Sequence, residues 1–445
     1  MIYSILTSSM NCPLVLEEGG QNMCSLNDTL GPSGSCKPNG KGKMPYFVLF
    51  ALCFFCLPAQ AQYGGGTGTQ SDPYLIRTAE QMNAIGAASS DWNKHFQLRA
   101  DIDLGEYTGT AYNIIGTDPE NSFHGIFDGN DHTISNLSLR TTRQWYTGLF
   151  GCVSGQIKNL GLIDPDVFAQ GGKVGSLLGD LNQGSLTSCY VERASVSGDY
   201  YIGGLVGSTS GRMLYCYSTG TVSGNHYVGG LVGYVTDATV NSSYSKANVT
   251  GNLEVGGLAG MTTNEEAVLS NSYATGSVNG GTYAGGLVGQ IERGRAYKCY
   301  SSGDVSGNLH VGGFTGYVRV LGGATHCFWD NQTSGWSTSP GGTGKTTVEM
   351  QTISTFTDVG WDFGDIWTIC DGMNYPVLLW QIPVTDFRCP DGVDFIDFAF
   401  FASHWLLNNC NASNYYCEGT DLDQSGSVGF TDLKILADNW LRGIQ

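Results

Sequence analysis

The sequence predicts an all-β protein that folds mainly as a parallel β-solenoid, with short capping helices and a small helical module at the C-terminal end. Three observations support this fold class. Glycine makes up 65 of the 445 residues without a Gly-X-Y period, a five-residue glycine unit recurs every 26 to 29 residues, and a ladder of aromatic residues follows the same period. A unit this short cannot bury a core alone, whereas stacked units can.

The glycine unit occurs in two looser and five clear copies, which predicts seven stacked coils. A β-propeller blade needs about 40 residues, so the shorter period favours one solenoid coil per copy. Coils should stack about 4.8 Å apart with like residues above like, joined by right-handed connections. The paired glycines indicate a corner that admits no Cβ atom. The copies are Thr147–Gly151, Gly175–Gly179, Gly203–Gly207, Gly229–Gly233, Gly256–Gly260, Gly285–Gly289 and Gly312–Gly316.

The aromatic ladder runs in phase with the glycine unit, and its members recur 27 to 29 residues apart. A cysteine precedes four of them, which favours a stacked apolar row over a metal site. The sequence alone does not decide whether cysteines on adjacent coils form disulfides. The ladder consists of Tyr190, Tyr217, Tyr244, Tyr273, Tyr300 and Phe328, and the cysteines are Cys189, Cys216, Cys299 and Cys327.

Both ends of the solenoid need protection because open sheet edges invite aggregation. Thr78-Ala79-Glu80-Gln81 has a capping-box pattern and predicts an N-terminal helix. Thr346-Thr347-Val348-Glu349 predicts a similar short helix after the last repeat. The aromatic-rich stretch 361–380 should then close the C-terminal end.

The first 61 residues are predicted to lie outside the mature fold. Two lysines, Lys41 and Lys43, precede the apolar run 46–57 and Ala59-Gln60-Ala61, which is typical of a signal peptide with its core at 44–61. Met44 is then a candidate start, and the mature protein should be secreted or cell-surface, with no transmembrane segment. The predicted division is leader and signal peptide 1–61, N-terminal cap and first coils 62–146, repeats 147–339, C-terminal cap 340–383, and helical module 384–445.

The net charge limits the classes of partner that the protein is expected to bind. A net charge of −18, with only 13% charged residues, argues against nucleic acid and anionic membranes, whose binding depends on Lys and Arg. A soluble acidic exterior, or sites for a hard cation, fits such an acidic chain better.

The helical module contains a loop and an amphipathic helix twice, at an offset of 35 residues. The second loop has the spacing of an EF-hand-type calcium loop, in which Gly426 permits the sharp turn. A solvated turn is the alternative. The expected calcium ligands are Asp421, Asp423, Ser425, Ser427 (through its carbonyl) and Asp432. The first loop is degenerate, with Arg388 and Pro390 at ligand positions, and its candidate ligands are Asp386, Asp391, Asp394 and Asp397.

The repeat Tyr-x-Gly-Gly-Leu-Val-Gly resembles the GLUG repeat of exported bacterial proteins. The likeness covers about residues 62–382 and includes the segments 68–76, 127–134 and 341–376. It implies a β-solenoid used at the cell surface. It implies no reaction, and the sequence lacks the His-Glu-x-x-His motif of metallopeptidases.

The duplicated loop and helix resemble a type I dockerin over about residues 384–443. Dockerins dock onto cohesin modules and often carry Ser or Thr at loop positions 10 and 11. Here those positions are Phe395-Ile396 and Phe430-Thr431. The resemblance implies a calcium-stabilised docking or anchoring module, whose partner is a cohesin-like protein or another cell-surface component.

Carboxylate pairs suited to sugar cleavage are few. The β-helical lyases and hydrolases need clustered carboxylates, or a base beside calcium, on one face. No carboxylate recurs at the repeat spacing as an acid/base pair. We therefore expect a non-catalytic scaffold that binds polysaccharide or protein; the alternative is a dockerin-bearing polysaccharide lyase or glycoside hydrolase. The candidate pairs are Asp101 with Asp103, Asp128 with Asp131, and Glu265 with Glu266.

Overall fold

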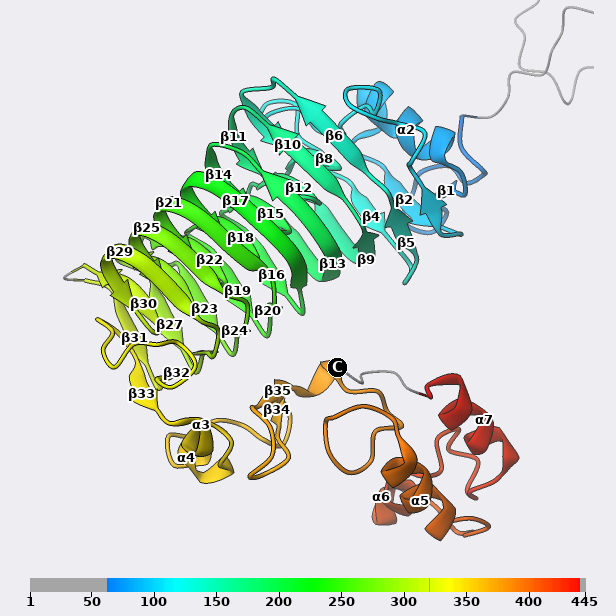
Figure 1. The fold of residues 1–445 in the computed structure, drawn as a ribbon. Helices are drawn as coiled ribbons and strands as arrows, with labels where there is room; N and C mark the ends of the chain where they lie inside the picture. Colours follow the sequence, from blue (N-terminus) through cyan, green and yellow to red (C-terminus); the bar gives the residue numbers. More distant parts are fainter. Residues whose placement is uncertain (1–61, 320, 441–445) are drawn as a thin grey trace, which may run out of the picture. The chain divides into compact units, whose positions relative to one another are not determined.

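A computed structural model describes residues 62–319 and 321–440 (Figure 1). The fold is mostly β, with a parallel solenoid of about nine turns and few, short helices. The turns outnumber the seven predicted coils because strands between Tyr74 and Thr141 stack in register with the later turns without carrying the glycine unit. The predicted leader and signal peptide lie outside the described residues.

Strands of successive turns pair in parallel, so each turn adds one rung to several rows of a single large sheet. The row that begins each turn holds β1 (Tyr74–Ile76), β2 (His95–Leu98), β4 (Ile126–Asp128), β9 (Gln156–Ile163), β13 (Ser185–Ser197), β16 (Arg212–Leu214), β19 (Thr239–Asn241), β23 (Val268–Ser270), β27 (Arg295–Tyr297) and β31 (Gly323–Thr325). The next row, which β9 and β13 also reach, holds β3 (Ile102–Asp103), β5 (Thr133–Ser135), β17 (Tyr217–Gly229), β20 (Tyr244–Ser245), β24 (Tyr273–Ala274), β28 (Tyr300–Ser301), β32 (Phe328–Asp330) and β33 (Thr343–Lys345). The remaining strands are β6 (Ser138–Thr141), β7 (Trp145–Thr147), β10 (Asp166–Ala169), β11 (Gly172–Val174), β14 (Tyr200–Gly203), β21 (Asn248–Gly256), β25 (Val278–Gly285) and β29 (Val305–Gly312).

The second sheet has seven parallel strands and contains the end of each glycine unit. Many of its apolar residues belong to one core that runs through the solenoid, together with the leucine of the first six units and Phe314 of the seventh. Its strands are β8 (Phe150–Val153), β12 (Leu178–Leu181), β15 (Val206–Thr209), β18 (Val232–Thr236), β22 (Ala259–Thr263), β26 (Val288–Ile291) and β30 (Thr315–Val318).

The paired glycines form a column in which the backbones of adjacent turns touch. A Cβ atom on Gly204 would lie 2.2 Å from the carbonyl oxygen of Gly230, and one on Gly230 would lie 2.1 Å from that of Gly257. Steric exclusion therefore explains the pair, as predicted. None of these three glycines has a positive φ. The left-handed conformation falls earlier in the turn, at Tyr201 and Tyr227, which both have φ 56°.

The aromatic ladder lies outside the solenoid core and belongs to a second hydrophobic cluster. The rings from Tyr190 to Tyr300 stack 4.8–5.0 Å apart and within 6° of parallel. The stretch 361–380 covers this ladder: Trp367 lies against Tyr273 and Tyr300, and Trp380 reaches back to Tyr217. The same stretch also contacts Phe328 of the last turns through Trp361. Its role in closing the C-terminal end stays a prediction.

The capping helices begin where the sequence predicts. In α2 (Ala79–Ala87) the N-cap Thr78 accepts a hydrogen bond from the backbone N–H of Gln81, and α3 (Thr347–Met350) has a complete capping box between Thr346 and Glu349. The short α4 (Ile353–Thr357), β34 (Trp367–Thr368) and β35 (Val377–Leu378) follow, the two strands pairing antiparallel. No helix among the described residues is long and apolar enough to cross a membrane.

The C-terminal module holds α5 (Phe395–Ser403), α6 (Tyr415–Glu418) and α7 (Phe430–Asp438). The helices α5 and α7 keep the predicted offset of 35 residues at both ends. Cys410 and Cys417 form a bridge within the module, while Cys389 pairs with Cys370, which precedes the module. The cysteines beside the aromatic ladder are free and buried.

Candidate functional sites

The second loop of the module gathers three carboxylates. Asp421 and Asp432 are buried and Asp423 is exposed, and one carboxylate oxygen from each lies within 4.8 Å of the others. Asp421 accepts hydrogen bonds from the backbone N–H groups of Ser425 and Gly426, both at 3.0 Å. Gly426 has φ +94°, so its turn suits glycine alone. The three aspartates are therefore brought together around a turn that Gly426 makes.

The last carboxylate of each loop is held in the same way in both copies. Asp432 accepts from the N–H groups of Asp423 (3.0 Å) and Gly429 (2.8 Å). Its counterpart Asp397 accepts from Arg388 (3.2 Å) and Asp394 (3.0 Å), each 35 residues earlier. The duplication seen in the sequence thus extends to the hydrogen bonds that shape each loop.

The first loop concentrates negative charge without gathering its carboxylates as tightly. Burial, with the nearby charges of Asp397, Asp391 and Asp394, raises the pKa of Asp386 to about 7, although a hydrogen bond from Gly392 opposes the shift. The Oδ1 atom of Asp386 is buried and has no hydrogen-bond partner. Asp394 caps α5 instead, accepting from the N–H of Ile396 at 2.6 Å. Within the described residues, three carboxylates come together only in the second loop.

Both loops offer what a hard cation needs. Calcium prefers carboxylate, carbonyl and hydroxyl oxygens, and a carboxylate oxygen that already accepts one hydrogen bond retains a lone pair. The unpartnered Oδ1 of Asp386 and the three gathered carboxylates of the second loop fit that chemistry. In the second loop the Ser425 hydroxyl donates to the Ser427 carbonyl at 3.2 Å, so these two predicted ligands lie side by side.

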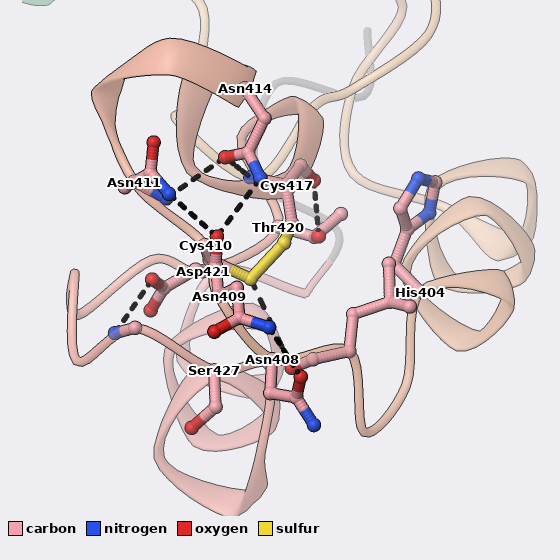
Figure 2. The surroundings of a disulfide bond; sticks show 12 residues. His404, Asn408, Asn409, Cys410, Asn411, Asn414, Cys417, Thr420, Asp421 and Ser427 are labelled. Atoms are coloured by element: carbon pink, nitrogen blue, oxygen red, sulfur yellow. Dashed lines mark hydrogen bonds between the residues drawn. A yellow bond between two sulfur atoms is a disulfide. The ribbon is translucent and has the colours of Figure 1, made fainter.

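A disulfide lies beside the turn of the second loop. Cys410, bonded to Cys417, donates its backbone N–H to the carbonyl of Gly426 at 3.1 Å. Figure 2 shows Asp421 and Ser427 beside this bridge. The side-chain oxygen of Asn414 accepts from the N–H of Cys417 at 3.1 Å and fixes the other end. The hydrogen bond from Cys410 to Gly426 thereby connects the second loop to the segment that the bridge closes.

The solenoid carboxylates weighed for catalysis are used as structural acceptors. Asp101 accepts from the N–H of Thr133 at 2.8 Å, which lowers the pKa of the Asp101 carboxyl. Asp103 accepts from Asn136 at 2.9 Å and from the N–H of Gly105, which lowers its pKa as well. The remaining candidates lie at the surface or in an ion pair: Asp128 pairs with Lys158 at 3.0 Å, Asp131 is exposed with φ 62°, and Glu265 and Glu266 lie exposed on a loop.

The structure also reveals an aromatic pocket that the sequence did not predict. It has a volume of about 360 Å³ and opens where β7, β11 and β14 meet the second sheet. The sequence does contain aromatic residues at exposed turn positions, but the repeat period does not show which of these side chains lie next to one another. We call this site the aromatic pocket; its lining includes Trp145, Tyr146, Lys173, Tyr201, Ser208 and Tyr234.

The family model of the GLUG motif matches residues 198–223 and 224–250. These two stretches are GLUG repeats. They coincide with two successive solenoid turns, and each contains a left-handed tyrosine and the glycine column.

Two curated proteins are similar to part of this chain. A "Putative Gly-rich membrane protein" of Evansella cellulosilytica is 34% identical over 154 residues, which cover 33% of this chain and 18% of that protein. "Halomucin" of Haloquadratum walsbyi is 33% identical over 154 residues, covering 32% of this chain and 2% of that protein. The matches therefore span less than a fifth of the length of either relative.

Among solved structures, a "putative immunoglobulin A1 protease" from Bacteroides ovatus resembles this chain with a TM-score of 0.49 and 22% identity. The match covers 72% of this chain and 96% of the other. We draw no functional conclusion from a likeness of this degree.

Proposed function

We propose that the protein is an exported, non-catalytic interaction scaffold, whose solenoid surface binds polysaccharide or protein and whose C-terminal module is stabilised by calcium. The observation that carries this proposal is the commitment of Asp101 and Asp103 to turn hydrogen bonds with lowered pKa values. A general acid needs a raised pKa, whereas the pKa values of these two carboxyls are lowered. The membrane and mucin names of the two relatives agree with a role at the cell surface.

In the module, Asp421, Asp423, Ser425 and Asp432 would hold calcium together with the Ser427 carbonyl. Asp386 and Asp397, with Asp391 and Asp394, would hold a second ion less tightly. The ion supplies positive charge that offsets repulsion among these carboxylates and couples binding to folding of the loop. The chemistry of the donor set supports this assignment, because all of the side-chain donors are hard oxygens.

The module also offers an apolar surface to a partner. Phe395 and Phe430, which are equivalent in the two copies, are 77% and 81% exposed. Beside Phe395, a recess of about 440 Å³ is lined by Phe398, Leu433 and Trp440. Exposed aromatic side chains around a recess are typical of protein interaction sites. We infer that the module docks onto a cohesin-like protein or another cell-surface component.

A glycan array probed with the full chain, combined with a reducing-sugar assay on the same glycans, tests the scaffold function. We expect retention of a glycan or of a protein partner without release of reducing ends. Sugar release that disappears in Asp101→Asn or Asp103→Asn would show instead that the protein is a polysaccharide-degrading enzyme.

A further inference from the structure

One residue in each of seven successive turns adopts the left-handed conformation at the same corner, with φ between 50° and 64°. We call this the left-handed row. Such φ values cost L-residues roughly 1–2 kcal/mol, and glycine or asparagine would adopt them more easily. The row holds aromatic rings at most positions instead, which indicates selection for the side chains. Its members are Tyr146, Lys173, Tyr201, Tyr227, Glu254, Tyr283 and His310.

The rings of this row and its neighbours build the walls of the aromatic pocket. Tyr201 and Tyr227 stack 4.9 Å apart at 6°, and Tyr234 meets the Tyr201 ring edge-on at 4.9 Å. Trp145 is 45% exposed and its indole lies over Gly172, where a Cβ atom would be 2.5 Å from the ring. The missing side chain lets Trp145 reach to 6.2 Å from Tyr201. Aromatic rings from β7, β14 and β18 thus line the pocket.

A buried carboxylate continues the row beyond Tyr227. Glu254 is only 6% exposed, yet its Oε2 atom has no hydrogen-bond partner. Glu254 lies opposite Tyr227 in the register of β17 and β21, between the pairs His226–Leu253 and Val228–Val255. A buried acceptor without a donor is costly and marks a place for a ligand donor.

The chemistry of this surface selects its ligand. Flat, amphipathic rings stack on the C–H faces of sugars, while hydroxyl groups donate to an unpaired carboxylate. An anionic ligand is disfavoured because the Lys173 ammonium is already paired with Asp180 at 3.0 Å and Glu254 adds negative charge. Since the row rises one turn, about 4.8 Å, at a time, an extended chain can follow it along the solenoid. The ligand that fits is a neutral polysaccharide.

We propose that the aromatic pocket is a binding subsite for a neutral glycan, whose chain runs from Trp145 along the left-handed row as far as Glu254. The inference rests on the proposed function as an interaction scaffold and names one surface on which it acts.

Affinity electrophoresis of the full chain through mixed-linkage β-glucan, xyloglucan, galactomannan and polygalacturonate tests this proposal. We expect at least one neutral glycan to retard the chain, and Trp145→Ala and Tyr201→Ala each to weaken that binding at least tenfold. The matched control is Tyr297→Ala, because Tyr297 is similarly exposed, at 39%, but lies on β27 outside the row. Circular dichroism of each variant verifies that its fold is retained.

Each other outcome overturns the proposal in a recognisable way. If a neutral glycan binds but Trp145→Ala and Tyr201→Ala bind it as well as Tyr297→Ala does, the aromatic pocket is not the binding site. The scaffold function would still stand. If polygalacturonate alone retards the chain, or none of the four does, the neutral-glycan ligand is wrong, which leaves protein as the partner of the scaffold. Release of reducing ends in the same samples would contradict the scaffold function itself.

Discussion

The hydroxyl of Tyr273 and the side chain of Gln381 are hydrogen-bonded at 3.0 Å although 108 residues separate them. This bond joins the middle of the solenoid to the segment that follows it. Tyr300 makes a similar contact, donating to the carbonyl of Pro376 at 2.7 Å. The segment 361–381, which we call the cover, is therefore hydrogen-bonded to the tyrosine column. It buries tyrosine rings that would otherwise be exposed to solvent.

Removal of a large buried side chain from this cover should destabilise the protein strongly. Trp367 is fully buried between Tyr273, Tyr300 and Trp361, so Trp367→Ala should lower the free energy of unfolding by about 3–5 kcal/mol. Guanidinium denaturation measures the loss. Val348→Ala is the matched control, because Val348 is 72% exposed. Equal midpoints for the two variants would show that the cover contributes little.

The glycine column gives a second stability test. A Cβ atom on Gly204 meets the Gly230 carbonyl at 2.2 Å, whereas one on Gly323 meets nothing within 4 Å. We expect Gly204→Ala to cost at least about 3 kcal/mol or to prevent folding, and Gly323→Ala to change stability by less than about 0.5 kcal/mol. Thermal unfolding followed by circular dichroism compares them. Similar transitions would refute steric exclusion as the reason for the glycine pair.

Stability should also depend on pH through Glu254. Burial raises its pKa from 4.5 to about 7. The unfolded chain ionises first, so the folded state loses stability as pH rises from about 4.5 to 7 and the deficit stays constant above that. Glu254→Gln removes this penalty and should stabilise the fold at pH 8, relative to pH 5, by about 1–2 kcal/mol after allowance for solvent screening.

Urea denaturation at the two pH values measures this difference, with exposed Glu120 changed to Gln as the control. An equal change in stability at pH 5 and pH 8 in Glu254→Gln would contradict the pH dependence assigned to Glu254.

Periodicity was sufficient to predict the solenoid, the aligned tyrosines and the paired glycines, because each follows from which residues stack on which. Local capping patterns likewise located the helices after Thr78 and Thr346. The spacing of Asp421, Asp423 and Asp432 predicted that these carboxylates would gather.

Other features depend on contacts that no period expresses. A repeat does not tell whether a tyrosine column points inward or outward, so its cover by Trp367 and Trp380 was missed. The Cys370–Cys389 pair joins two segments whose spacing has no signature. The left-handed corner at Tyr201 was hidden because the alternating strand pattern continues through it.

Calcium binding to the module is tested most directly by isothermal titration calorimetry of the full chain after treatment with EDTA. We predict binding that is lost at the second loop in Asp421→Asn and retained in Asp438→Asn, since Asp438 pairs on the surface with Lys434 at 2.6 Å. Calcium at one hundred times its dissociation constant should stabilise the module by about 2.7 kcal/mol. Absence of binding heat, together with a module transition that EDTA does not shift, would contradict the calcium assignment.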